Sequence, residues 1–191
     1  MKKENLTPQE AENVLNKESG VYGLSTISVD FRDIEREALE GGKKSKRALD
    51  AFHYAVSAYV AKCAVAMGGI DVITFTAGVG EFSPYIRENC LKGLENLGIK
   101  IDPAKNAMAR TRNAETLISA DDSKIKIFVI PTDEELVMTE DAYAIMNGTY
   151  DVHTNFTYSF QSKDYVNKAR AEGLKKDLEK NPALANILAL K

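Results

Sequence analysis

Apolar side chains recur every three or four residues between Ser45 and Met67, a period that predicts one long helix. The residues that set this period are Leu49, Phe52, Val56, Val60, Cys63 and Met67. Gly68 and Gly69 follow at once, and glycine just past the last periodic position is typical of a helix end. A short apolar run, Val72–Phe75, comes next and predicts a strand.

The same succession of helix and strand patterns continues downstream. A helix is expected to open at Pro84 and to close at Gly98. Its apolar residues at helical spacing are Ile86, Cys90, Leu94 and Leu97. The run KIKIFVI, at positions 124–130, alternates at first and is then continuously apolar, as suits a central strand. Residues 132–135 supply a capping box for a further helix that should end near Met146, so the sequence predicts an α/β fold.

The two ends of the chain carry weaker patterns. A capping box at Thr7 and Glu10, with proline at the first helical position, predicts a short helix. Residues 21–36 have no clear period and are expected to run as loop or short strand before turning helical. Residues 150–160 alternate weakly, which leaves an edge strand and an ordered loop both open.

A charged amphipathic helix with a thin apolar stripe is predicted over residues 162–180. Two interpretations of it remain, a solvated helix packed along its own domain or an arm that packs on a partner. An Asn-Pro pair then breaks the chain before a short apolar end. The change of character after Gly148 predicts a domain at residues 1–148 and an extension at residues 149–191.

The stretch DVITFTAGVGEFS, at positions 71–83, carries the candidate chemistry. A strand runs into a glycine-containing loop and a helix opens beyond it, so backbone N–H groups gather at the carboxyl end of the strand. Open α/β sheets bind phosphate there, and glycine lets the main chain approach an anion closely. A tight turn without a ligand is the alternative. The stretch is neither a GxGxxG fingerprint nor a Walker loop, since no lysine follows Gly78 and Gly80.

Composition argues against several classes of function. The formal net charge of -3 and the pI near 5.5 argue against a general nucleic-acid binder. No apolar run approaches the roughly 18 residues of a membrane span, and the first ten residues lack the apolar core of a secretion signal. We therefore expect no membrane partner and a cytoplasmic location. Cys63 and Cys90 form no CxxC pair, and with only two histidines in the chain a His/Cys metal site is not expected.

Four segments, in order and at matching spacing, resemble the C-terminal part of the acetokinase family. The first joins LNKESGVYGLSTIS (15–28) to DFRDI (30–34), and the others are FTAGVGE (75–81), GLENLGIKID (93–102) and VIPTDEELV (129–137). Together they cover the chain almost continuously from Thr7 to Ala144. The resemblance implies an actin-like, ribonuclease-H-like domain of the superfamily that includes sugar kinases and Hsp70, in which two such domains close on a nucleotide.

The resemblance also implies an activity, phosphoryl transfer between ATP and a small carboxylate with magnesium. The expected reaction is ATP:acetate phosphotransfer, which gives acetyl phosphate and ADP, and the expected cofactors are ATP or ADP and Mg2+. By position, the nucleotide-binding residues that it implies are Asp30, Phe31, Arg32, Gly78, Val79, Gly80, Glu81 and Phe82. Glu134 matches the family's magnesium-linked glutamate. No catalytic residue is implied here, because those residues lie in an N-terminal half without counterpart in this chain.

Residue chemistry alone leaves alternatives for several of these positions. Arg32 can pair with phosphate oxygens, or form a surface salt bridge with Asp30 or Glu35. Phe31 can pack on ribose or adenine, or in the protein core. Glu134 stands in the first turn of its predicted helix, where a carboxylate also stabilises the helix dipole. Other arginines are interpreted as solvated side chains, namely Arg87, Arg110 and Arg112.

The chain departs from the family at two loop positions. Ala77 stands where glycine is usual, and Phe82 stands where asparagine is usual. Phe82 cannot donate the hydrogen bond of an amide, which bears directly on nucleotide contact. Residues 149–191 are also expected to extend past the usual end of the family.

Two functions are therefore carried forward. In the first, the chain supplies the nucleotide- and magnesium-binding half of a kinase, is inactive alone, and meets a small carboxylate only with an N-terminal half. In the second, it is a non-catalytic assembly module. Family members dimerise through this region, so a homodimer or association with an N-terminal half is expected. A propionate or butyrate kinase stays open, because the carboxylate pocket lies in the other half.

Overall fold

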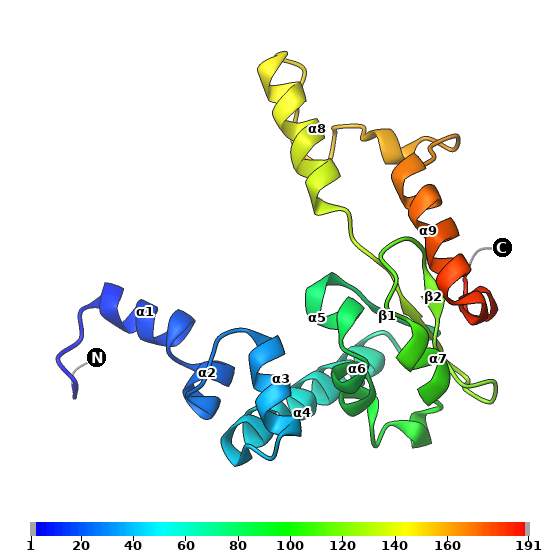
Figure 1. Ribbon diagram of the computed structural model, residues 1–191. Coiled ribbons are helices and arrows are strands. Elements are labelled where there is room, and N and C mark those ends of the chain that lie inside the picture. The colour runs from blue at the N-terminus through cyan, green and yellow to red at the C-terminus, as the bar shows by residue number, and fades with distance from the viewer. Residues whose placement is uncertain (1–2, 190–191) are drawn as a thin grey trace. The chain divides into compact units, whose positions relative to one another are not determined.

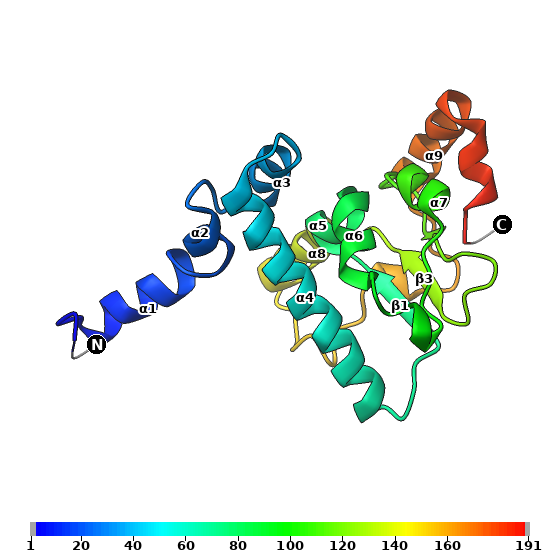
Figure 2. The same ribbon diagram turned by 90° about the horizontal axis from the view of Figure 1, so that it is seen from below.

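The computed structural model describes residues 3–189, which fold into two compact units (Figures 1 and 2). Unit 1 comprises Met1–Ile70 and Tyr85–Gly98, and unit 2 comprises Asp71–Pro84 and Ile99–Lys191. Within the described residues, no helix is long and apolar enough to cross a membrane. Unit 1 is built from helices, whereas unit 2 contains a small sheet with helices.

Unit 1 is organised around one long helix. Its helices are α1 (Pro8–Lys17), α2 (Gly20–Ser25), α3 (Phe31–Leu39), α4 (Lys43–Ala66) and α6 (Pro84–Leu91), followed by a 3-10 turn at Glu95–Leu97. Both α2 and α3 pack against α4. Ile34 of α3 and Leu49 of α4 are fully buried. Ser57 Oγ donates a hydrogen bond of 2.6 Å to the Cys90 carbonyl oxygen, which ties α4 to α6.

The sequence anticipated some of these helices and missed others. The capping box at Thr7 and the long helix α4 are confirmed. A loop or a short strand was expected at the start of residues 21–36. This prediction is wrong, because the helix α2 occupies positions 20–25. The helix α6 ends at Leu91 rather than at Gly98, because Gly93 adopts a φ of 89°, a left-handed conformation that glycine tolerates and a helix does not.

Unit 2 contains a three-stranded sheet with the order β1 (Val72–Phe75), β3 (Lys126–Val129), β2 (Thr116–Leu117). β1 and β3 run parallel, and β2 pairs antiparallel with β3. Both predicted strands are confirmed, and the continuously apolar one is central as expected. The short strand β2 was not predicted. It is completed by a bridge between Thr116 and Leu188, near the end of the chain.

The helices of unit 2 correct several expectations. They are α5 (Ala77–Phe82), α7 (Pro103–Met108), α8 (Glu134–Met146) and α9 (Lys168–Lys180), with 3-10 turns at Ser159–Gln161 and Pro182–Asn186. The glycine-containing loop expected after β1 is the short helix α5. The helix α8 ends at Met146 as predicted, but its N-cap is Asp133, whose carboxylate accepts a hydrogen bond from the Leu136 N–H. Residues 150–160 form no strand, and α9 begins at Lys168, later than expected.

The C-terminal segment is integrated into unit 2, where Figure 1 shows α9 and the residues after it beside β2. The Leu117 N–H donates to the Ile187 carbonyl oxygen at 2.7 Å. Leu184 and Ile187 are buried. The helix α9 therefore packs along its own unit, which is one of the two interpretations that its sequence left open.

Candidate functional site

The site is positioned by the parallel strands of unit 2. In the register of β1 and β3, Phe75 lies opposite Val129, so the carboxyl ends of the two strands are neighbours. The chain leaves β1 directly into α5 and leaves β3 into the segment that precedes α8. Ligand sites of open α/β sheets form at such strand ends. The topology thus brings together two segments that are far apart in the sequence.

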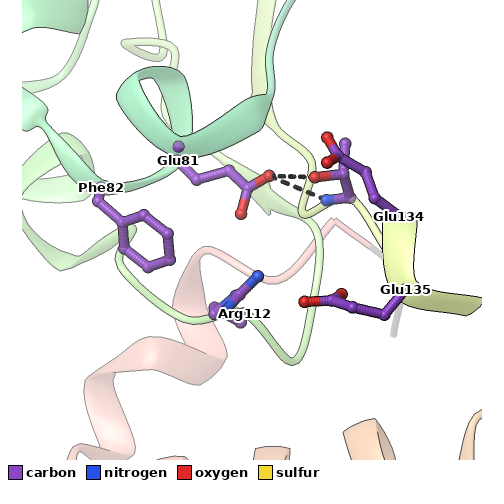
Figure 3. Close-up of a pocket in the computed structure, with 7 residues that line it drawn as sticks. Glu81, Phe82, Arg112, Glu134 and Glu135 are labelled. Carbon is purple, nitrogen blue, oxygen red and sulfur yellow. Dashed lines mark hydrogen bonds between the residues drawn. The ribbon is translucent and has the colours of Figure 1, made fainter.

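A buried carboxylate joins these two segments. Glu81 of α5 is 3% exposed, and its Oε1 atom accepts hydrogen bonds from the N–H and the Oγ1 hydroxyl of Thr132, each at 2.9 Å (Figure 3). Burying a charge is costly unless hydrogen bonds compensate, and these two contribute to that compensation. Glu81, predicted to contact nucleotide, therefore also holds the start of α8 against α5.

A small pocket opens beside this contact, with a cavity volume of about 100 Å3. The residues that line it are Gly78, Glu81, Phe82, Arg112, Thr132, Glu134 and Glu135. Sites for whole ligands occupy about 300–1,000 Å3, whereas each water molecule in liquid takes about 30 Å3. The pocket has room for a small ionic group with a few waters, and not for a complete nucleotide.

The turn from β1 into α5 has one unusual backbone conformation. Ala77 adopts a φ of 58°, in the left-handed region that costs a residue with a Cβ about 1–2 kcal/mol. A glycine at this position, as is usual in the resembling family, would be free of that cost. Strained backbone of this kind tends to occur at functional sites.

The two glycines of α5 have different surroundings. A Cβ placed on Gly78 would meet no atom within 4 Å, and Gly78 lines the pocket. A Cβ on Gly80 would lie 3.4 Å from the Phe75 Cβ, so Gly80 lets α5 approach the end of β1 closely. Gly80 and its neighbour Val79 were predicted nucleotide-binding residues, and both lie in α5 outside the pocket lining.

The other predicted nucleotide segment, Asp30 to Arg32, lies in unit 1 at the start of α3. Asp30 is the N-cap, and its carboxylate pairs with the Arg32 guanidinium at 2.5 Å. Hydrogen bonds from the Arg32 side chain, and then from its backbone N–H, lower the pKa of Asp30 to about 2. Phe31 packs edge-on against Phe52, with ring centroids 4.7 Å apart. In this structure the surface ion pair and the aromatic contact, both foreseen as alternatives, are formed.

Glu134 and Glu135 supply exposed carboxylates at the first turn of α8, on one side of the pocket. Within residues 3–189, no group of three or more His, Cys, Asp or Glu side chains is arranged to hold a metal ion. Mg2+ is commonly bound through one or two carboxylates together with substrate phosphates, and it keeps several waters. The donor set thus fits a magnesium ion that arrives with a phosphorylated ligand better than one held by the protein alone.

Three residues of the pocket, Arg112, Thr132 and Glu135, were not among the predicted site residues. Arg112 was interpreted as a solvated side chain, and it is exposed, with its guanidinium carbon 5.5 Å from the centroid of the Phe82 ring. The same interpretation is wrong for Arg87, which is fully buried. Figure 3 shows Arg112 and Glu135 pointing toward the same space as Glu81 and Phe82. No local motif marks Arg112, because its place depends on tertiary contacts of the segment around it. Glu135 could have been found from its position beside Glu134 in the first helical turn.

Comparison with known proteins identifies close relatives. A sequence profile of the acetokinase family matches residues 1–140. An acetate kinase from Treponema pallidum (strain Nichols) is 52% identical over 189 residues, which is 98% of this chain and 42% of that protein. The chain thus spans about two fifths of the length of that relative. This alignment leaves out only two residues of the chain, so it includes most of residues 149–191. That segment extends past the end of the family profile, but the Treponema pallidum relative has a counterpart of it.

Solved structures of kinases share the fold. The crystal structure of Porphyromonas gingivalis acetate kinase matches with a TM-score of 0.67 and 37% identity, over 76% of this chain and 36% of that one. A propionate kinase from Francisella tularensis subsp. tularensis SCHU S4 matches with a TM-score of 0.62 and 34% identity, over 70% of this chain and 33% of that one. These similarities confirm the α/β fold of the actin-like ATPase type. The chain belongs to the acetokinase family.

Proposed function

We propose that this chain supplies the nucleotide- and magnesium-binding part of an ATP:acetate phosphotransferase. In that reaction a carboxylate oxygen of acetate attacks the γ-phosphorus of ATP, the bond to the leaving ADP breaks, and acetyl phosphate forms. One observation carries the proposal. The segments FTAGVGE and VIPTDEELV, which resemble the family, meet at one pocket through the hydrogen bonds between Glu81 and Thr132.

The charge of the pocket supports a role for a divalent cation. Three of its lining residues are carboxylates, namely Glu81, Glu134 and Glu135, and Arg112 is the cation among them. A free phosphate would be repelled by such a lining, whereas a phosphate that carries Mg2+ would be attracted. Glu134 and Glu135 would hold the ion through its water shell. The ion supplies charge neutralisation at the phosphates, on which phosphoryl transfer depends together with positioning.

Residues Asp30 to Arg32 of unit 1 are also proposed to bind nucleotide. Arg32 is 89% exposed in its side chain, so its pairing with Asp30 is a surface contact of low strength. A phosphate oxygen can replace that carboxylate at little cost. Phe31 presents an aromatic ring at the first turn of α3, where ribose or adenine can pack. Val79 and Gly80 belong to α5, the helix that carries Gly78 and Phe82, and Gly80 lets this helix approach β1 closely.

The carboxylate substrate is proposed to bind only when an N-terminal half, like that of the longer relatives, is also present. The chain covers 42% of the Treponema pallidum acetate kinase, and no catalytic residue is assigned to it. We therefore expect the 191-residue chain alone to transfer no phosphoryl group above a buffer control. A coupled assay for ADP release with acetate and MgATP tests this, and clear activity of the chain alone would contradict it.

Acetate, propionate and butyrate are all candidate substrates within this proposal. The structural similarity extends to a propionate kinase. Acetate, propionate and butyrate kinases would share the same nucleotide-binding part. A comparison of the three carboxylates is informative only once activity has been reconstituted with an N-terminal half.

A second candidate function, an assembly module without catalysis, is favoured by α8. Only Ala144 of this helix is buried among its described residues, and Figure 1 shows it extending away from the sheet. Its exposed apolar side chains are Met138, Tyr143, Ile145 and Met146. Exposed apolar patches of this kind mark interaction surfaces. A homodimer, or a complex with an N-terminal half, would cover them, and sedimentation analysis of the chain with and without nucleotide distinguishes the two functions.

A further inference from the structure

Arg112 lines the pocket and has no carboxylate partner among the described residues. Of the described residues that line the pocket, it alone carries a positive charge. Its guanidinium faces the Phe82 ring, and residues 3–189 give it no ion pair, in contrast to Arg170, which pairs with Glu115 at 2.9 Å. An arginine held in this way is available to an incoming anion.

The turn that carries Arg112 is anchored on both sides. Thr111 Oγ1 and Asn113 Nδ2, the two neighbours of Arg112, each donate a hydrogen bond of 2.8 Å to the same oxygen, Oδ2 of Asp177 in α9. The Asn113 N–H also donates to Thr111 Oγ1 at 2.9 Å. The hydrogen bonds from Asn113 and then Thr111 lower the pKa of Asp177, so the carboxylate is stabilised as an acceptor. Asp177 therefore fixes the conformation of the Arg112 turn.

The sequence of α9 is adapted to this contact. Gly173 stands in the interior of the helix, where glycine is unfavourable. A Cβ at Gly173 would lie only 2.5 to 2.7 Å from side-chain atoms of Asn113, so the glycine makes room for the anchored turn. At its other end, the α9 N-cap Asn167 donates from Nδ2 to Asp133 Oδ2 at 3.0 Å. The C-terminal segment thus touches both the Arg112 turn and the N-cap of the helix that carries Glu134 and Glu135.

We propose that Arg112 contacts the phosphate groups of the bound nucleotide and that Asp177 is a positioning residue that holds Arg112 in place. The inference rests on the proposed nucleotide-binding function. Arginine binds phosphate through charge-assisted and often bidentate hydrogen bonds. At this pocket it would offset part of the carboxylate charge of the lining residues. Segment 162–189 then acts as a brace for the binding site and not only as a cover of the sheet.

Calorimetry of the full 191-residue chain tests the role of Arg112. MgADP and adenosine are titrated into the wild type, Arg112→Ala and Arg110→Ala, a matched control at an exposed arginine outside the pocket lining. We expect Arg112→Ala to weaken MgADP binding about tenfold or more, because a hydrogen bond to a charged group is lost. Adenosine, which has no phosphate, should bind all three proteins equally. An Arg112→Ala protein that binds MgADP as the wild type does would overturn the inference.

The brace is tested through Asp177. Asp177→Ala removes the shared acceptor and should weaken MgADP several-fold, whereas Asp177→Asn keeps an acceptor oxygen and should bind within about twofold of the wild type. A readout that does not depend on nucleotide is trypsin cleavage after Arg112, followed by mass spectrometry. It should become faster in Asp177→Ala and in Gly173→Ala, which displaces Asn113 and serves if Asp177→Ala does not fold. Unchanged cleavage in folded variants would contradict the brace.

The outcomes separate this inference from the proposed function. If the folded wild-type chain binds no MgADP, the proposed function and the inference both fail. If the wild type binds MgADP but Arg112→Ala and Arg110→Ala bind it equally well, the function stands and the inference alone fails. Weaker binding of MgADP, but not of adenosine, by Arg112→Ala supports both.

Discussion

Replacing Ala77 by glycine should stabilise the protein, although glycine usually destabilises a helix. Ala77 has a φ of 58° at the entry to α5, and it is exposed, so its methyl group contributes little packing. The left-handed conformation costs alanine about 1–2 kcal/mol. Glycine avoids that cost but loses about 0.4–1 kcal/mol through the greater freedom of the unfolded chain. The net expectation is a gain of about 0.5–1 kcal/mol in the free energy of unfolding.

Urea unfolding followed by circular dichroism measures this difference. The matched control is Ala142→Gly, at an exposed position within α8 of the same unit, where the ordinary helical backbone predicts a loss of about 1 kcal/mol. The same chemical change should therefore shift the urea midpoint in opposite directions at the two sites. A lowered midpoint for Ala77→Gly, similar to that of Ala142→Gly, would refute the reasoning and show that Ala77 is not strained.

Three further predictions concern the nucleotide affinity of a Phe82 variant, the reactivity of the two cysteines, and the pH dependence of stability through His53. Phe82→Asn should strengthen MgADP binding about threefold, because an amide can donate a hydrogen bond, whereas Phe82→Leu should not; equal affinities in calorimetry would contradict this. Burial raises the pKa of the Cys90 thiol to about 12, while Cys63 is exposed, so Ellman's reagent at pH 8 should modify one thiol in the native protein and the second only after unfolding. Burial lowers the pKa of His53 in the folded protein. As the pH falls below about 6.5, the unfolded chain therefore binds a proton at this residue before the folded chain does, and the free energy of unfolding decreases. The free energy of unfolding should therefore fall more steeply between pH 7 and pH 5 in the wild type than in His53→Asn, and parallel pH profiles would exclude His53 as a cause.

The elements with strong sequence signals were predicted closely. The predicted strand Val72–Phe75 and the predicted end of α8 at Met146 both agree with the structure. Each has a signal in the local sequence: an apolar run between glycines for the strand, and a glycine just past the last turn for the helix. The segment that forms α5 was expected to be a loop, because its two glycines disfavour a helix locally. Contacts between α5 and the end of β1, where Gly80 lies close to Phe75, override that preference.

The parts of the site that escaped prediction depend on contacts between distant residues. The strand β2 has two residues, and its pairing with β3 and with Leu188 defines it more than its own sequence does. Arg112 lies at the pocket because its neighbours are bonded to Asp177, more than sixty positions later in the chain. The hydrophobic pattern of a short sequence segment cannot indicate a contact between residues so far apart in the chain. The carboxylate Glu81 was selected by resemblance, but its bond to Thr132 became visible only in the fold.

Binding of ADP to the full chain, measured by calorimetry with magnesium and then with a chelator, tests the central claim most directly. We expect saturable binding with one site, in the micromolar to low-millimolar range, that weakens when magnesium is removed. Gly78→Val should weaken it further, because a side chain at Gly78 meets no protein atom and would instead occupy space beside the pocket. A well-folded chain that gives no saturable heat with MgADP would contradict the account and favour the assembly function.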